Sequence, residues 1–133
     1  MTGFQTGSEP FFELLGFKIE EVTADFCRMR MPFRPQFQQA GGLVHGGAIA
    51  SLMDSAGVMA IKTGTESGMK GVPTITMTVN YLAPAREIDV LAEAKIIRRG
   101  RSIVFVDVDV TAPSGEAIAK GQLVYKLPSG GKP

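Results

Sequence analysis

Residues 45–62 read HGGAIASLMDSAGVMAIK, and this stretch decides how the rest of the chain can fold. From Gly47 to Lys62 it contains no proline and has almost no polar side. This is typical of a helix of about four turns that is buried nearly all round. Lys62 and the following Gly64 indicate a C-terminal cap. Such an apolar helix needs other elements around it.

Apolar residues recur at every second position on both sides of this helix, which is typical of strands with one buried face. Before the helix, residues 17–31 form two such arms, and the odd-numbered residues from 27 to 31 are apolar. After it, four segments separated by turn residues alternate in this way: 74–81, 89–96, 103–110 and 117–126. In the last segment we expect Ile118 to face outward and four residues to face inward: Ala117, Ala119, Leu123 and Tyr125.

The order of these segments predicts an α+β fold, in which a curved antiparallel sheet wraps around one long buried helix. Short turns between successive strands make antiparallel pairing the expected arrangement. A short helix over residues 10–15, introduced by Ser8-Glu9 and closed by Gly16, precedes the first strand. We expect a single domain over residues 1–133, with a loose tail at 128–133.

The Thr-rich segment 74–82 is the candidate for a sheet edge, because it directly follows the helix. An edge strand leaves backbone N–H and C=O groups without partners, and pairing with the same strand of a second subunit satisfies them. We therefore expect a homodimer through this edge, and a dimer of two such dimers as the homotetramer.

The composition favours a soluble cytoplasmic protein. The net charge is +1, from 14 Lys and Arg against 13 Asp and Glu, so bulk charge gives no basis for binding nucleic acid. Cys27 is the only cysteine, which excludes an intramolecular disulfide. The most apolar stretch, 43–61, is interrupted by His45 and Asp54, and the N-terminal residues carry no apolar signal segment. We expect neither a membrane span nor export.

Two glycines at the start of the helix predict a site for a carbonyl oxygen. A helix start leaves backbone amides without internal partners, and the helix dipole adds partial positive charge there. Because Gly46 and Gly47 lack side chains, a ligand carbonyl can approach these amides closely. This pattern is typical of an oxyanion hole.

Asp54, eight residues after Gly46, is the exceptional residue of the helix. Its neighbours Leu52, Met53 and Ala56 are apolar, and burial of an unpaired carboxylate is costly. Partial desolvation makes a carboxylate a better base or nucleophile. The alternative is a structural role, in which a neighbouring strand satisfies the side chain. The glycine at this spacing favours catalysis.

The motif HGGAIASLMDSA at residues 45–56, followed by a strand that ends in NYLAPAR at residues 80–86, resembles the hotdog-fold thioesterases, and among them the phenylacetate-pathway type. The resemblance extends from about Phe11 to Leu127. It implies a hotdog fold and an acyl-CoA thioesterase activity. Coenzyme A is then part of the substrate, and no cofactor is expected.

The resemblance also implies roles for single residues. The amide of Gly46 would hold the thioester carbonyl, while Asp54 of the neighbouring subunit would attack it or activate water. Relatives place Asn or Gln seven residues before this glycine and often Ser or Thr seven residues before the strand tyrosine, and Gln39 and Thr74 occupy these positions. Gln39 would orient the thioester or the water, and Thr74 would hold the water. His45 fits a residue that shapes the turn better than one that reacts.

A basic turn, Arg98-Arg99-Gly100-Arg101, links two of the predicted strands. It is either a solvated hairpin or, as the resemblance implies, a site for the phosphates of coenzyme A, which suits arginine geometry. A metal site is not expected, because one His and one Cys cannot form a usual ligand set.

Two functions remain open: an acyl-CoA thioesterase, and a non-catalytic acyl-CoA-binding regulator on the same fold. A hotdog dehydratase is less supported, since such enzymes use a His with an acidic partner and the only His here, His45, lies in the turn. The acyl group stays open as well. The seven methionines fit either an adaptable apolar tunnel or a plain core.

Overall fold

The computed structural model describes residues 9–63 and 71–128. Its elements in chain order are α1 (Pro10–Leu15), β1 (Lys18–Thr23), β2 (Phe26–Met31), the 3-10 turn η2 (Pro35–Phe37), α2 (Gly46–Lys62), β3 (Thr74–Tyr81), β4 (Val90–Arg99), β5 (Ile103–Thr111) and β6 (Ala117–Lys126). The predictions for Ser8, Gly64 and the tail from residue 129 onward concern residues outside this description. The predicted helix over residues 10–15 is confirmed, and Gly16 ends it in a left-handed conformation with φ of 74°.

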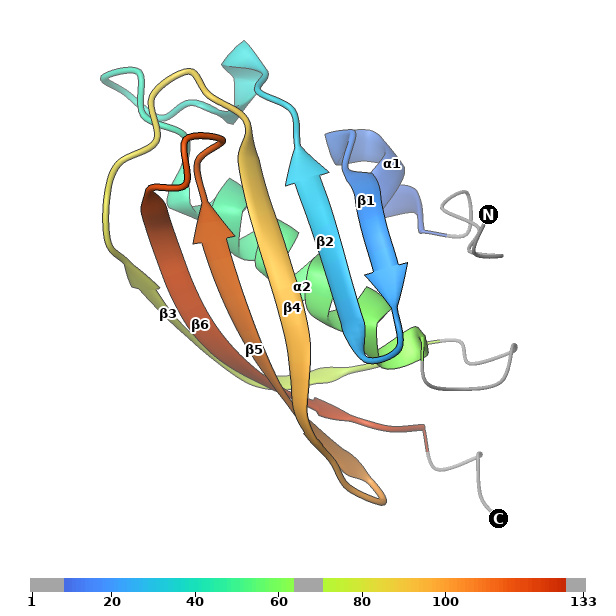
Figure 1. The fold of residues 1–133 in the computed structure, drawn as a ribbon. Coiled ribbons are helices and arrows are strands. Elements are labelled where there is room, and N and C mark those ends of the chain that lie inside the picture. The colour runs from blue at the N-terminus through green and yellow to red at the C-terminus, as the bar shows by residue number, and fades with distance from the viewer. Residues whose placement is uncertain (1–8, 64–70, 129–133) are drawn as a thin grey trace.

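Six antiparallel strands form one curved sheet in the order β1-β2-β4-β5-β6-β3, and α2 packs against one face of it (Figure 1). The helix lies mainly on β2 and β4. This arrangement confirms the predicted α+β architecture. It also places β3 at an edge of the sheet, as the Thr-rich segment predicted.

Successive strands are not all neighbours, because β3 pairs with β6 and β4 pairs with β2. The expectation of short turns throughout is therefore wrong at residues 82–89, which cross from the edge to the middle of the sheet. This connection binds the loop before α2 instead. The Val44 N–H donates to the Ala85 carbonyl over 2.8 Å, and Leu43 pairs with Arg86. Alternation reveals the faces of a strand, whereas its neighbours depend on tertiary contacts.

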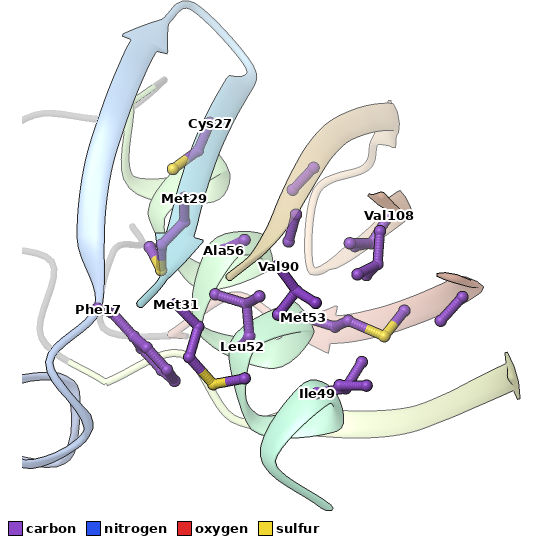
Figure 2. Packing of buried hydrophobic residues seen from close by; sticks show 14 of the residues in the cluster. Phe17, Cys27, Met29, Met31, Ile49, Leu52, Met53, Ala56, Val90 and Val108 are labelled. Atoms are coloured by element: carbon purple, nitrogen blue, oxygen red, sulfur yellow. The ribbon is translucent and has the colours of Figure 1, made fainter. Parts of the chain in front are cut away.

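The inward faces of β2, β4 and β5 form the core against α2, as the alternation predicted (Figure 2). Burial of a large apolar side chain contributes about 1.5–3 kcal/mol each. The inward residues are at most 1% exposed: Cys27, Met29, Met31, Val90, Ala92, Ala94, Val104, Val106, Val108 and Val110. Four of the seven methionines are buried in this core, so these four fill space between helix and sheet: Met29, Met31, Met53 and Met59.

One prediction fails in β6, where Ala117 is exposed and Ile118 is fully buried. The register explains the exchange, because Thr111 pairs with Ala117 while Val110 pairs with Ala119. Ile118 is thus the extra residue of a β-bulge, which turns a side chain away from strict alternation. The later inward positions of β6, including Leu123 and Tyr125, follow the prediction.

Only one face of α2 is buried within the single chain, which corrects the prediction of burial nearly all round. Leu52 and Ala56 are fully buried, whereas Asp54, Ser55 and Val58 stay partly exposed on the other side. The sheet covers the helix from one side, so the opposite face remains open.

No helix within the described ranges has both the length and the hydrophobicity needed to cross a bilayer.

Candidate active site

The first turn of α2 leaves one backbone amide without a partner. His45 caps the helix, and its Nδ1 accepts from the Gly47 N–H over 2.8 Å. The Ala48 and Ile49 amides donate to the His45 carbonyl over 3.0 and 3.3 Å. Within residues 9–63 and 71–128, the Gly46 N–H has no acceptor. Of the two predicted glycines, Gly46 therefore offers a free donor, whereas the amide of Gly47 is already bound.

Tyr81, at the end of β3, holds the start of α2 from the other side. Its hydroxyl donates to the Gly46 carbonyl over 2.7 Å. A Cβ atom at Gly46 would lie 3.2 Å from the Tyr81 ring, so the glycine gives this ring room to lie against the backbone. The sequence reasoning assigned no role to this hydroxyl, although the strand ending NYLAPAR marks its position.

Gln39 lies in the loop before α2, at the Gly46 end of the helix. Its backbone closes the loop, because its N–H donates to the Leu43 carbonyl over 2.8 Å. The side chain is exposed and makes no hydrogen bond within the described part of the chain. The structure thus places Gln39 near the helix start without bringing it to Asp54.

Asp54 lies in the middle of α2 and is held by two hydroxyl groups from the sheet. Its Oδ1 accepts from Thr74 Oγ1 over 2.8 Å and from Tyr125 Oη over 2.9 Å. Among the described residues, no ion pair and no donor reaches the other oxygen, Oδ2. The carboxylate is therefore anchored on one side and free on the other.

A small pocket opens beside this carboxylate. Its walls come from the segment around α1 and from the outer face of α2: Glu9, Phe11, Phe12, Asp54, Ser55, Val58 and Met59. Its volume of about 100 Å³ is well below the roughly 300–1,000 Å³ of typical ligand pockets. Glu9 is paired with Lys62 over 2.6 Å, so the charge of that carboxylate is balanced. This pocket by itself is therefore too small for a typical ligand.

Tyr125 is a site residue that the sequence reasoning placed in the core without a function. It is fully buried at the inward face of β6, and its hydroxyl reaches α2. Burial raises the pKa of Tyr125, and the neighbouring Asp54 carboxylate raises it further. The hydroxyl therefore stays protonated and donates. A buried tyrosine needs a partner for its hydroxyl, and that rule was the available signal.

Gly46 and Asp54 do not converge within one chain. They are eight residues apart on the same helix, which separates them by about 12 Å along its axis. A carbonyl oxygen held by the Gly46 amide is therefore out of reach of the Asp54 carboxylate of the same subunit.

The three arginines of the predicted basic turn differ in their contacts. The Nη2 of Arg99 donates to Asp25 Oδ1 over 2.7 Å and to the Ile61 carbonyl over 3.2 Å, so Arg99 braces the C-terminal end of α2. Arg98 and Arg101 are exposed and have no ion-pair partner in the described residues. In that same part of the chain, no three His, Cys, Asp or Glu side chains gather in a way that could hold a metal ion.

Comparisons with known proteins agree with this fold. Residues 41–119 match the family described as the thioesterase superfamily. The chain is 32% identical over 123 residues to human acyl-coenzyme A thioesterase 13, covering 88% of this chain and 84% of that protein. A thioesterase structure from Haemophilus influenzae superposes with a TM-score of 0.82 at 25% identity, over 89% of this chain and 82% of that chain.

The PaaI protein from the phenylacetic acid degradation operon of E. coli also has a TM-score of 0.82, over 90% of this chain and 84% of that chain. Its identity is 19%, so this similarity concerns the fold alone. Together these findings confirm the predicted hotdog fold and the predicted thioester hydrolase. The chain belongs to the thioesterase superfamily.

Proposed function

We propose that this protein hydrolyses acyl- or aryl-CoA thioesters to the free acid and coenzyme A. The observation that carries the proposal is the state of Asp54: a partly buried carboxylate with no cationic partner among the described residues, anchored through Oδ1 and open at Oδ2. The free oxygen of a carboxylate held in this way is available to take a proton or to attack a carbonyl carbon. The similarity to human acyl-coenzyme A thioesterase 13 supports coenzyme A as the thiol.

The complete site requires a second copy of the chain. β3 is an edge strand of the sheet, and one face of α2 stays partly exposed in the single chain. A two-fold axis at this edge joins the two β3 strands antiparallel and lays the two α2 helices side by side in opposite directions. The start of one helix then lies opposite the middle of the other. Gly46 of one subunit and Asp54 of its partner can face one thioester.

The chemistry follows from these groups. The Gly46 amide donates to the thioester carbonyl oxygen, where negative charge develops. Asp54 Oδ2 takes a proton from water while the water oxygen attacks the carbonyl carbon. Collapse of the tetrahedral intermediate breaks the C–S bond, and the leaving thiolate receives the proton from Asp54. In the nucleophilic variant, Oδ2 attacks the carbon, the thiolate leaves, and water hydrolyses the resulting anhydride.

Other residues assist in this proposal. Thr74 donates its only hydroxyl proton to Asp54, but its oxygen can still accept a hydrogen bond from the attacking water. Gln39 orients the thioester or the water. Exposed Arg98 and Arg101 bind the coenzyme A phosphates, while Arg99 braces the helix. We expect this enzyme in the cytoplasm as a dimer or a dimer of dimers.

The first test is a panel of acyl-CoA esters with a free-thiol reagent. Cys27 is fully buried, and burial raises its pKa to about 12, so the released thiol is the signal. We expect Asp54→Asn to lower kcat by about 10²–10⁴. Asp109→Asn is the matched control, because this acid pairs with Lys120 on the outer face of the sheet. Saturable binding of acyl-CoA without thiol release would support the non-catalytic regulator instead.

A second test asks whether the site spans two subunits. Gly46→Pro removes the amide donor and Asp54→Asn removes the base, so each variant alone is inactive. A mixed dimer contains one site with both groups intact. After unfolding and refolding of an equal mixture, we expect about a quarter of the wild-type activity from random pairing. No recovery, with dimers present, would place both groups in one subunit and contradict the proposed geometry.

A further inference from the structure

Tyr125 contacts Asp54 at two atoms. Its hydroxyl oxygen lies 2.9 Å from the carboxylate Oδ1 and 3.0 Å from the backbone carbonyl oxygen of the same residue. The phenol ring is fully buried. The contact joins β6 to the middle of α2, between residues 71 positions apart in the sequence. A buried tyrosine needs a partner for its hydroxyl, and here that partner is the Asp54 carboxylate.

Gly57 makes this contact possible. It lies three residues after Asp54, about one turn along α2. A Cβ atom at Gly57 would lie 2.2 Å from the Tyr125 hydroxyl oxygen and 2.9 Å from the ring carbon that carries it. The backbone of Gly57 is helical and needs no special φ. A glycine is therefore needed at this position because the Tyr125 side chain occupies the space that a Cβ atom would fill.

The hydroxyl has one proton and two acceptors within reach. When Asp54 is ionised, a charge-assisted bond to Oδ1 is the stronger one. When Asp54 has taken a proton or carries an acyl group, the same hydroxyl can turn to the backbone carbonyl without moving the ring. Tyr125 can thus follow the change of charge at the carboxylate during a catalytic cycle.

We propose that Tyr125 is a positioning residue, which together with Thr74 fixes Oδ1 of Asp54 and leaves Oδ2 as the atom that reacts. The two hydroxyls come from neighbouring strands, β6 and β3, so they define the orientation of the carboxylate from two directions. This inference rests on the proposed thioesterase function. It adds the choice of oxygen and a residue that acts through Asp54.

The main variant is Tyr125→Phe, which removes one buried hydroxyl and keeps the ring. A hydrogen bond to a charged group corresponds to about a tenfold to hundredfold effect. We expect kcat to fall by this factor while KM stays within about twofold. In the Asp54→Asn background the same change should cause no further loss, because Tyr125 acts only through that carboxylate.

The pH profile gives a second readout, which a structural role would not change. If Tyr125 acts through the Asp54 carboxylate, the kcat profiles of Tyr125→Phe and the wild type should differ in shape, whereas a structural role would change only their height. The other charged side chain that lines the pocket is Glu9, which pairs with Lys62 over 2.6 Å, and this pair is the same in the wild type and in Tyr125→Phe.

Gly57→Ala is the second variant, because the added methyl group must displace the Tyr125 hydroxyl. We expect the same loss of kcat as in Tyr125→Phe. Gly71→Ala is the matched control, since a Cβ at Gly71 meets nothing within 4 Å. A cooperative thermal unfolding transition in each variant shows that it is folded.

The outcomes separate the two proposals. If the wild-type protein releases no thiol from any acyl-CoA, the proposed function fails and this inference with it. If Asp54→Asn is inactive but Tyr125→Phe keeps the wild-type kcat and pH profile, only the role of Tyr125 is overturned. Equal losses from Tyr125→Phe in the wild-type and Asp54→Asn backgrounds would also overturn it, because the residue would then act independently of Asp54.

Discussion

The two ends of the proposed site, both on α2, are built in different ways. At the helix start, His45 and the turns of the local chain bind the neighbouring amides and leave the Gly46 N–H free. In the middle of the helix, Asp54 is held by hydroxyls that come from 20 and 71 residues away. The donor end is a local backbone structure, whereas the acidic end depends on the sheet.

Strand β3 connects the two ends of the site, because it begins with Thr74 and ends with Tyr81. Thr74 binds the Asp54 carboxylate and Tyr81 binds the Gly46 carbonyl. A single edge strand therefore contacts α2 both at Gly46, which offers the amide donor, and at Asp54, the proposed base. The strand expected to form the dimer interface is also the strand that aligns the site, so assembly and catalysis should be coupled.

Among the variants that leave Asp54 in place, removal of the amide donor should have the largest effect. Gly46→Pro deletes the free N–H at the first helical position, where proline is accepted. His45 before it is extended, with φ of −62° and ψ of 135°, which suits a following proline. We expect kcat/KM to fall about 10²–10³-fold, as for the loss of one oxyanion donor.

Gly46→Ala is the control for this variant. Both substitutions add a Cβ next to the Tyr81 ring, 3.2 Å away, but alanine keeps the N–H. The difference between the two variants therefore measures the amide. Equal kcat/KM values for Gly46→Pro and Gly46→Ala would show that the Gly46 amide does not bind the thioester carbonyl oxygen.

Loss of one of the two hydroxyls that hold Asp54 should have a smaller effect. Thr74→Val keeps the β-branched shape that suits a strand but removes one of the two donors to Asp54. We expect a fall in kcat of about tenfold, while Thr74→Ser should retain most of the activity. A serine protein as impaired as the valine protein would indicate that the methyl group, rather than the hydroxyl, matters.

Removal of the Tyr81 hydroxyl should lower the activity less than removal of the Thr74 hydroxyl. Tyr81→Phe removes the hydroxyl that donates to the Gly46 carbonyl. A single neutral hydrogen bond contributes about 0.5–1.5 kcal/mol, so we expect a decrease of this size in the free energy of unfolding and a fewfold decrease in kcat/KM. Urea unfolding and steady-state kinetics measure both. A change confined to stability would make Tyr81 a structural tie only.

The smallest effect on kcat is expected at His45. Its Nδ1 caps α2, so His45→Ala should destabilise the protein by about 0.5–2 kcal/mol, and His45→Asn should restore most of this. We expect kcat of both variants to stay within about twofold at a temperature where they are folded. An inactive but stable His45→Asn protein would favour direct chemistry by the imidazole.

Much of the molecule could be read without coordinates because the signals are local. The apolar run of α2, its glycine start and the alternation of β2, β4 and β5 predicted elements that the structure contains. The single acid in that run predicted Asp54 as a site candidate, and the structure brings Thr74 to it as well. The catalytic roles of both remain predictions.

Errors and omissions occurred where a residue depends on distant parts of the chain. The bulge that buries Ile118 arises from the pairing of β5 with β6. Arg99 belonged to a basic turn in the sequence, but its guanidinium contacts Asp25 and the end of α2. Tyr125 looked like one more inward residue of a strand, and its function depends on what lies opposite.

Sequence alone determined the architecture class, the central helix with its exposed glycine start, and the acid within it, because hydrophobic periodicity and backbone capping act between residues close in the chain. Only the tertiary structure decided that β3 pairs with β6, that Tyr125 crosses over Gly57 to reach Asp54, and that Oδ1 is anchored while Oδ2 is open. These contacts join residues from separate strands and the helix. Their geometry is set by how the sheet curves over α2, and no local pattern encodes that.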